Sequence, residues 1–297
     1  MATLTDREAL ASRIVPSMTL SSGTGSSQTA PPAQDAPSCA ESRFRVTGNA
    51  VVTGGAGTLG LTACNALLEH GLSGLLIVDM DPATSETQIE ELRAKFPQAK
   101  IITTKMDITD EEAVDAAFEE GKNVLGSIDI LCCFAGIVGC IDALSMPPSQ
   151  FRKVLDVNTT GAFICAQAAA KRMVDQGTGG SITFIASISA HRVNFPQPQV
   201  AYNVSKTGLL MLKSSLAAEW ARYGIRTNTI SPGYMDTILN EGDGLQGHRA
   251  IWAERNPFGR MGVPRELTGA VVLLASREAG SYINGADIVV DGGGIVF

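Results

Sequence analysis

The sequence predicts an α/β protein with a single doubly wound parallel sheet and helices on both faces. Two observations support this prediction. Predominantly apolar segments of strand length alternate along the chain with amphipathic segments of helical period, and this alternation runs from Phe44 almost to the end. Apolar strands indicate a sheet that is buried on both faces, and helical crossovers make its strands parallel. Ligands of such a sheet bind beyond the carboxyl ends of the strands.

The 297 residues suffice for one large domain or two small ones. We expect one domain, residues 44–297, preceded by a disordered N-terminal extension, residues 1–43. The segment Ser21–Ser38 is rich in Ser, Thr, Gly, Pro and Ala and has almost nothing to bury. Before it, Thr5 and Glu8 have the spacing of a capping box that opens a short helix. Acidic residues and the lack of an apolar core argue against a signal peptide there.

The first half of the domain is expected to contain four strands and three helices. In chain order they are strand 45–53, helix 57–70, strand 75–78, helix 84–95, strand 101–106, helix 109–120 and strand 128–133. The second of these helices stops before Pro97, which lacks the N–H that a helix interior needs. The third begins with Thr109 and Glu112, whose spacing is that of a capping box.

The second half continues the same alternation. Its elements are helices 149–155 and 158–176, strand 182–186, helix 200–223, strand 225–230, helix 263–275 and strand 288–290. Pro264 stands in the first turn of the last helix, where proline is well tolerated. Adjacent Cys132 and Cys133 should point to opposite faces of the sheet. Residues 234–262 are expected to form a lid over the ligand crevice.

Composition excludes several classes of partner. A net charge of −7 and an aromatic content of 5% argue against a nucleic-acid partner, which needs a basic face or stacking platforms. No apolar run is long enough for a transmembrane helix, so we expect no membrane partner. The six cysteines show neither a CxxC pair nor a zinc-ligand spacing. They predict reduced thiols in a cytoplasmic protein without a metal site.

A glycine-rich loop, residues 53–60, follows the first strand and opens a helix. Its glycines fit the pattern G-x-G-x-x-G, which permits a tight turn and lets bare backbone approach a pyrophosphate at the helix N-terminus. A tight turn without a ligand is the alternative interpretation. The candidate phosphate-binding residues of this loop are Gly54, Gly55, Gly57, Thr58, Leu59 and Gly60.

Two acidic residues lie at the ends of the second and third expected strands. Asp79 ends the second strand, where a carboxylate can accept hydrogen bonds from the adenosine ribose of NAD and repel the 2′-phosphate of NADP. We therefore expect NAD, with NADP as the alternative. Asp107 with Ile108 ends the third strand and is placed to meet the adenine. A loop acid with no ligand is the alternative for Asp107.

A candidate catalytic group lies on the long helix. Tyr202 and Lys206 are four residues apart and share one helix face. Reduction of a carbonyl needs an acid that protonates the developing alkoxide, and a nearby ammonium and the positive nicotinamide should lower the pKa of a tyrosine for the reverse step. Ser187 ends the fifth strand, at the ligand edge of the sheet. Asn158 begins a helix, where an N-cap is the alternative role.

Taken together, these motifs resemble the short-chain dehydrogenase/reductase family over about residues 44–297. The resemblance is carried by the loop 53–60, Asp107-Ile108, Ala135-Gly136, Asn158, Ser187, Tyr202 to Lys206, Ser231-Pro232-Gly233 with Thr237, and Val290 to Gly293. It implies a single Rossmann-type domain, a nicotinamide cofactor and hydride transfer between that cofactor and a secondary alcohol or ketone.

The resemblance also implies a role for each matching residue. Tyr202 is the acid/base, and Lys206 lowers its pKa and holds the nicotinamide ribose. Ser187 hydrogen-bonds the substrate oxygen, and Asn158 fixes a helix carbonyl and a water that links Lys206 to solvent. The remaining cofactor contacts implied by the family are Ala135, Gly136, Pro232, Gly233 and Thr237, of which the last three seat the carboxamide.

The identity of the catalytic serine is ambiguous in the sequence, and two other sites depart from the family pattern. The commonest spacing from Tyr202 selects Ser189, but the preceding strand selects Ser187, and we prefer the strand because loops absorb extra residues. The usual second glycine of the loop is Thr58 here. We expect two compensating features: Gly57 takes unusual backbone angles, and the Thr58 hydroxyl donates to a phosphate oxygen. Cys133-Phe134 replaces two asparagines that normally brace the end of the sheet.

The segment 187–206 is most similar to fungal polyol and ketose reductases such as D-arabinitol 2-dehydrogenases, mannitol dehydrogenases and sorbose reductases. A polyol or ketose substrate is therefore expected. A reductase of a fungal secondary metabolite, a dinucleotide-sensing protein without turnover, and an acidic scaffold are the alternatives. We also expect a homotetramer or dimer, because 165–170 and the leucines of 209–216 give apolar faces on the two helices that pair across subunits in this family.

Overall fold

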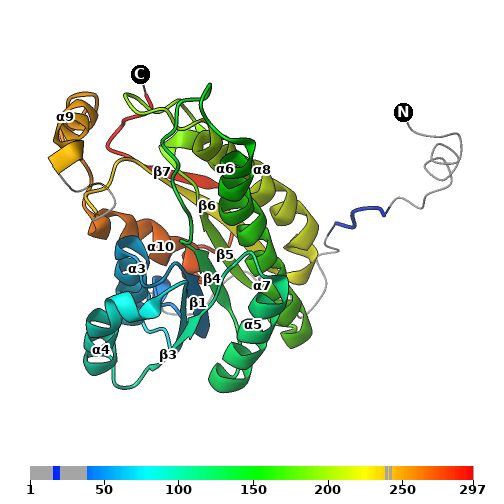
Figure 1. The fold of residues 1–297 in the computed structure, drawn as a ribbon. Coiled ribbons are helices and arrows are strands. Elements are labelled where there is room, and N and C mark those ends of the chain that lie inside the picture. Colours follow the sequence, from blue (N-terminus) through cyan, green and yellow to red (C-terminus); the bar gives the residue numbers. More distant parts are fainter. Residues whose placement is uncertain (1–15, 21–38, 238–239, 241–242, 297) are drawn as a thin grey trace, which may run out of the picture.

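Seven parallel strands form one sheet in the computed structural model, in the order β3-β2-β1-β4-β5-β6-β7 (Figure 1). The strands are β1 Asn49–Thr53, β2 Gly74–Asp79, β3 Lys100–Lys105, β4 Ile130–Cys133, β5 Gly180–Ile185, β6 Ile225–Pro232 and β7 Asp287–Val290. The predicted doubly wound sheet is confirmed. The chain leaves β1 towards β3 on one side and towards β7 on the other, so the ligand crevice of such a sheet lies between the ends of β1 and β4.

Helices cover both faces of the sheet. They are α2 Ala40–Arg43, α3 Thr58–Glu69, α4 Glu86–Lys95, α5 Glu111–Leu125, α6 Pro148–Leu155, α7 Ala162–Gln176, α8 Val200–Trp220, α9 Gln246–Glu254 and α10 Thr268–Ala275. Short 3-10 segments lie at Pro82–Ser85, Ile188–Ala190, Ala221–Tyr223, Asp243–Leu245 and Pro264–Leu267. The structure describes residues 16–20, 39–237, 240 and 243–296. The helix expected near Thr5 and the linker 21–38 lie outside them.

The core has two halves, one on each face of the sheet. The first packs α3, α4 and α10 against alternate strand residues, and the second packs α5, α7 and α8 against the others (Figure 1). Cys132 lies in the first half and Cys133 in the second, as the alternation of a strand predicts. Both thiols are buried.

Four residues assigned to the extension belong to the folded part instead. Ala40–Arg43 form α2, and the carbonyl of Arg43 accepts hydrogen bonds from the Ser276 hydroxyl (2.9 Å) and the Ala279 amide (3.2 Å). The apparent boundary at Phe44 was wrong by a few residues, because a helical turn held by backbone acceptors leaves no apolar signal in the sequence.

The connection from β4 to β5 also differs from the prediction. Helices α6 and α7 are not separate, because a π-helical turn, Asp156–Gly161, joins them into one continuous rod. A π-turn inserts one extra residue per turn and often occurs at functional sites. Asn158, expected at a helix start, is therefore buried inside this turn.

In the described ranges no helix is both long and apolar enough to cross a membrane. Within the same residues, no group of three or more His, Cys, Asp and Glu side chains is arranged to hold a metal ion.

Candidate active site

The glycine loop is packed against the chain that follows β4. Gly54 has a φ of +65°, and a Cβ there would lie 2.5 Å from the amide nitrogen of Ala135. A Cβ on Gly60 would collide with the carbonyl oxygen of Gly54. These glycines let the loop fold tightly between β1 and α3 and keep backbone atoms at the surface of the crevice.

The start of α3 suits a phosphate. Gly57 is the N-cap residue and supplies no side-chain acceptor, so the first amides of the helix, those of Thr58, Leu59 and Gly60, have no cap. Unpaired amides and the helix dipole bind anions such as a pyrophosphate. The loop therefore fits the dinucleotide that the sequence predicts.

Thr58 is accommodated in a different way from the one expected. Gly57 has ordinary extended angles, φ −73° and ψ 162°, whereas Gly54 takes the left-handed conformation. Thr58 is simply the first residue of α3, and its carbonyl accepts a hydrogen bond from Thr62 Oγ1 (2.8 Å). The expectation about Gly57 is wrong because an N1 position of a helix accepts a β-branched residue without any compensation from its neighbour.

Replacing Gly54 with Ala is expected to abolish saturable NADH binding and to lower the free energy of unfolding by about 2 kcal/mol or more. The reasons are the left-handed φ and the contact with Ala135. Gly269→Ala is the control, since this exposed glycine of α10 lies outside the loop and its Cβ would meet nothing within 4 Å. NADH fluorescence titration and thermal unfolding measure both effects. Equal behaviour of the two variants would contradict the geometry.

Asp79 ends β2 beside the glycine loop. Its Oδ2 accepts a hydrogen bond from the Ala56 amide (3.2 Å), and Ser85 Oγ donates to the Ala56 carbonyl (2.7 Å). The half-buried carboxylate is thus held at the side of the loop, near the sheet edge where the sequence placed it. The Asp79 carboxylate therefore braces the glycine loop and places a negative charge in the crevice.

Asp107 has a local explanation. It lies two residues beyond the end of β3, and its Oδ1 accepts hydrogen bonds from the amide (2.9 Å) and hydroxyl (2.8 Å) of Thr109. These bonds hold the pKa of Asp107 below its usual value. The side chain is exposed, whereas Ile108 is buried against Gly161 of the π-turn. Asp107 therefore has the contacts of an acidic loop residue, and its contact with an adenine stays a prediction.

Tyr202 and Lys206 project from the first turns of α8 towards the ends of β4 and β5. Lys206 Nζ lies 5.5 Å from the centre of the Tyr202 ring and donates a hydrogen bond to the Ile185 carbonyl (2.7 Å). Lys206 is buried, and this burial lowers its pKa to about 8. Ile185 is the last residue of β5, so the lysine ties α8 to the strand that leads to Ser187.

The pKa of Tyr202 differs from the expectation. Burial raises it to about 12, while a hydrogen bond with Ser187 acts in the opposite direction. In the protein alone Lys206 does not bring it below the ordinary value, because the ammonium is itself desolvated and lies over the ring rather than at the hydroxyl. The protein's own groups thus favour a protonated Tyr202, which is the acid form that carbonyl reduction needs.

Ser187 and Ser189 are distinguished by their contacts. Ser187 Oγ accepts a hydrogen bond from the Ser189 amide (3.1 Å) and donates one to Ser189 Oγ (3.0 Å). Of the two serines, Ser187 is the one that shares a hydrogen bond with Tyr202. Both side chains are buried, but Ser187 stands between Ser189 and the tyrosine. The choice of Ser187 from the strand is supported by this order.

Asn158 holds the loop after β4. Its Oδ1 accepts a hydrogen bond from the Ile137 amide (2.8 Å), and its Nδ2 donates to the Ile137 carbonyl (2.9 Å) and to Ser205 Oγ (3.0 Å). Asn158 is thus not the N-cap that was the alternative, and its amide bonds to a loop carbonyl where we expected a helix carbonyl, because the π-turn directs it at this loop. A Cβ on Gly136 would lie 3.2 Å from Asn158 Oδ1 and 3.6 Å from Lys206 Nζ. Asn158 therefore brings Ala135-Gly136 against the lysine.

Cys133 and Phe134 brace the sheet end through packing and backbone. Cys133 is buried in the core half that contains α8, and Phe134 packs against the half that contains α3. The Phe134 amide donates to the Thr53 carbonyl at the end of β1 (2.8 Å). Apolar contacts and this backbone hydrogen bond thus brace the edge where the family normally has polar side chains.

The segment after β6 reaches the same edge. Pro232 is the last residue of β6, and the Gly233 amide donates to the Val290 carbonyl of β7 (3.0 Å). Thr237 is buried, and its carbonyl accepts from the Asn240 amide (2.8 Å). Described residues of the expected lid include α9, in which Trp252 is the buried residue.

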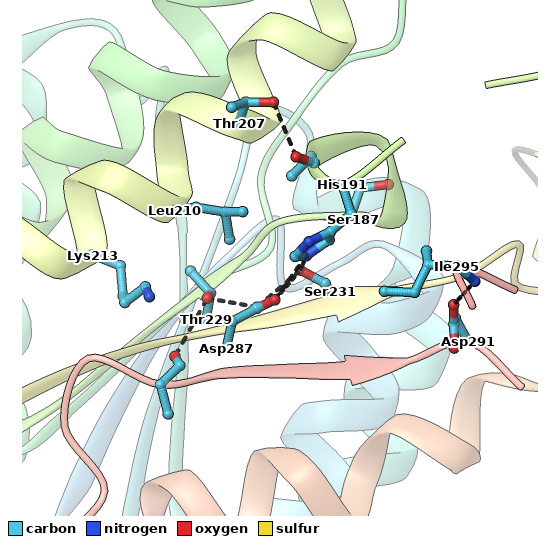
Figure 2. Close-up of polar contacts among 12 residues, drawn as sticks. Ser187, His191, Thr207, Leu210, Lys213, Thr229, Ser231, Asp287, Asp291 and Ile295 are labelled. Atoms are coloured by element: carbon cyan, nitrogen blue, oxygen red, sulfur yellow. Dashed lines mark hydrogen bonds and ion pairs between the residues drawn. The ribbon is translucent and has the colours of Figure 1, made fainter. Parts of the chain in front are cut away.

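Sequence reasoning missed a polar network behind Ser187. His191 Nε2 lies 2.8 Å from Asp287 Oδ2, and the carboxylate of Asp287 also accepts from Thr229 Oγ1 (2.7 Å) and Ser231 Oγ (2.9 Å) (Figure 2). On the other side, Thr207 Oγ1 of α8 donates to the Ala190 carbonyl (3.3 Å). The turn after Ser187 is thereby fixed to both α8 and β7. No sequence pattern signals a pair that is 96 residues apart.

Comparison with known proteins agrees with this geometry. A family model described as enoyl-(acyl carrier protein) reductase matches residues 54–294. D-arabinitol 2-dehydrogenase [ribulose-forming] of Scheffersomyces stipitis is 36% identical over 265 residues, which is 84% of this chain and 95% of that protein. The chain belongs to the short-chain dehydrogenase/reductase family. It is therefore an oxidoreductase that transfers a hydride between a nicotinamide cofactor and a CH–OH group.

Two further members of the short-chain dehydrogenase/reductase family show the same likeness. NADH-dependent L-xylulose reductase of Ambrosiozyma monospora is 34% identical over 266 residues, covering 84% of this chain and 96% of that protein. The crystal structure of a short-chain type dehydrogenase/reductase from Mycobacterium marinum superposes with a TM-score of 0.80 at 37% identity, covering 84% of this chain and 96% of the other. The family recognised from the motifs is confirmed.

Proposed function

We propose that this protein interconverts a polyol and the corresponding ketose with NAD(H), in a crevice between the glycine loop and the start of α8. The observation that carries the proposal is the convergence of Ser187, Tyr202 and Lys206 at the ends of β4 and β5, beside the uncapped start of α3. The substrate class is supported by the two relatives, whose names include an arabinitol and a xylulose.

The protein's groups divide the proton chemistry between them. A nicotinamide supplies or accepts the hydride when it is bound. Ser187 donates a hydrogen bond to the substrate oxygen, and Tyr202 gives that oxygen its proton in reduction or removes it in oxidation. Lys206 holds a positive charge near the tyrosine, which stabilises the phenolate left after proton transfer. Asn158 keeps the loop at Gly136 closed over the lysine.

A substrate panel tests the proposal. Ketoses, polyols and simple ketones are assayed with NADH, NADPH and their oxidised forms by the absorbance of the reduced nicotinamide. We expect turnover with at least one ketose–polyol pair. Turnover with simple or bulky ketones alone would contradict the substrate class and leave the reaction type intact.

Asp79 is expected to favour NAD(H) over NADP(H) by about 10²-fold in kcat/KM. Its carboxylate accepts hydrogen bonds from a ribose diol and repels a 2′-phosphate, and hydrogen bonds to charged groups are worth about 1.5–3 kcal/mol. Asp79→Ser should reduce this preference at least tenfold. Asp175→Ser, at an exposed aspartate of α7, should leave it unchanged. A wild type that prefers NADPH would show that Asp79 does not face the 2′ position.

We also propose a homo-oligomer, a tetramer or dimer, but through a different surface from the one expected. Cys165 to Ala170 are mostly buried, and Leu209 and Leu216 lie in the core, so those apolar faces serve the interior. Apolar side chains that do point outwards from α7 and α8 are Phe163, Val174, Val200, Val204 and Met211, the last 70% exposed.

Met211→Glu is accordingly expected to shift the protein towards monomer in sedimentation experiments at micromolar concentration, because a charge in an apolar interface is costly. Leu144→Glu, at a fully exposed loop position, is the control. A wild type that sediments only as a monomer would refute the oligomer.

A cytoplasmic location belongs to the proposal as well. It is supported by the six free thiols, of which four are buried in the core. Such thiols suit a reducing compartment.

A further inference from the structure

A recess opens between the turn after Ser187 and the lid. Residues 192–195, Tyr234, Trp252 and Arg255 line it, and we call it the lid recess. Its walls come from the two segments that flank the proposed active site, one following β5 and the other following β6. None of these lining residues has a part in the hydride transfer described above.

Tyr234 is held rigidly in this recess. Its ring stacks on Trp252 with centres 4.2 Å apart and an interplanar angle of 7°. Trp252 Nε1 donates to Gln197 Oε1 (3.1 Å), and Gln197 Nε2 donates to the Tyr234 hydroxyl (3.0 Å). These contacts hold the Tyr234 hydroxyl oxygen in one defined position. A side chain that selects between substrates must be held in this way.

The Tyr234 hydroxyl has a proton to donate. Its oxygen accepts from Gln197 Nε2 and from Asn194 Nδ2 (2.9 Å), so both lone pairs are used. Its own O–H is then directed elsewhere. Beside it, Asn194 Oδ1 is buried and has no hydrogen-bond partner among the described residues. Turning the amide over would pair Oδ1 with Tyr234 and leave the N–H groups unpaired instead, so either orientation leaves an unsatisfied polar group here.

The recess adjoins the catalytic tyrosine. Gln197 Nε2 also donates to Gln199 Oε1 (3.0 Å), and Gln199 is the buried residue that precedes α8. Its carbonyl accepts from the Asn203 amide (2.9 Å), one residue after Tyr202. A charge on Tyr234 would raise the pKa of Tyr202, which places the two phenols within electrostatic reach.

The residues of the recess do not favour an anionic ligand. The Arg255 guanidinium lies 4.7 Å from the centre of the Phe195 ring, at an exposed position on the rim. The inner groups, Asn194 and Tyr234, are neutral. One unpaired acceptor next to one available donor matches a hydroxyl group, which gives one hydrogen bond and accepts another.

We propose that Asn194 and Tyr234 form a subsite that recognises a substrate hydroxyl close to the reacting carbon. The ligand class is a hydroxyketone or the corresponding polyol, in preference to an unsubstituted ketone. Asn194 Oδ1 accepts a hydrogen bond from the substrate hydroxyl, and the Tyr234 hydroxyl donates a hydrogen bond to the oxygen of that hydroxyl. The inference rests on the proposed function, because it places the reacting carbon at Tyr202. A site built to bind a hydroxyl discriminates strongly against analogues that lack it.

The test compares two ketones that differ by one hydroxyl, 3-hydroxybutan-2-one and butan-2-one, together with a ketopentose. We expect Asn194→Ala to lower kcat/KM for the two hydroxylated substrates about tenfold or more and to leave that for butan-2-one within about threefold. Tyr234→Phe keeps the stacked ring and should show the same selective loss. Asn123→Ala, at an exposed asparagine of α5, is the control.

Three outcomes overturn the subsite: no preference of the wild type for the hydroxylated ketone, an equal loss on both ketones, or no effect of either variant. These results leave the proposed function standing as long as the ketopentose is reduced. If no ketone is reduced, the proposed function fails instead. The subsite is then tested by calorimetric titration of the NADH-loaded protein with a pentitol. The subsite predicts that Asn194→Ala binds the pentitol more weakly than the wild type does. Unchanged pentitol binding would refute it.

Discussion

Tyr202→Phe is expected to lower kcat by about 10²–10⁴-fold while NADH still binds with wild-type affinity. The substitution keeps the ring in place on α8 and deletes the only proposed proton donor, and positioned acid/base catalysis contributes a factor of this size. Single-turnover kinetics and NADH fluorescence titration measure the two quantities separately. Tyr282→Phe, at a fully exposed tyrosine, should behave as wild type.

The pKa of Tyr202 predicts how the rates of reduction and oxidation change with pH. Burial raises the pKa of Tyr202 to about 12, so the protonated form dominates at neutral pH. Reduction uses that form together with the charged Lys206, whose pKa is about 8, so its rate should depend little on pH between about 6 and 7 and decline above about 8. Oxidation uses the phenolate, whose fraction rises with pH, so its rate should increase between about pH 7 and 9. Retention of more than about a tenth of the wild-type kcat in Tyr202→Phe would show that another group moves the proton.

Lys206→Met is expected to lower kcat about 10²-fold or more and also to weaken NADH binding. The ammonium is the positive group nearest to the Tyr202 ring among the described contacts, and its loss leaves the phenolate without a stabilising charge. Unchanged NADH affinity would argue against a ribose contact. Lys171→Met, at an exposed lysine of α7, is the control.

The same variant should not lose stability at neutral pH. The pKa of Lys206 is lowered to about 8 in the folded protein, from its ordinary 10.5, because burial disfavours the ammonium. The folded state therefore binds fewer protons than the unfolded state between about pH 8 and 10.5, and this lysine's destabilising effect is largest below pH 8 and declines as pH rises. Thermal unfolding at pH 7 should find Lys206→Met at least as stable as wild type. A large drop would mean that the bond to Ile185 outweighs the desolvation.

Much of the fold could be read from the sequence because its signals are local. Apolar strands followed by amphipathic helices determined the order of the elements, and the ends of parallel strands brought Asp79 and Ser187 to one edge of the sheet. Helical spacing was enough to place Tyr202 and Lys206 on a common face.

Features that depend on tertiary contacts could not be read in this way. The π-turn at Asn158 has no signature in residue type, and the positive φ of Gly54 follows from its packing against Ala135. An alanine-rich helix such as α7 looks apolar all round, so the sequence does not say which side faces the core. The pKa of Tyr202 depends on burial that only the folded chain reveals.

Transfer of deuterium tests the central claim most directly. The wild type is incubated with NADH that carries deuterium on the transferable position of the nicotinamide, together with a ketopentose, and the product is analysed by mass spectrometry. The account predicts a pentitol with a single deuterium on the carbon that gained the hydroxyl group, and no such product from Tyr202→Phe in the same time. NADH binding without any labelled pentitol from the wild type would contradict it.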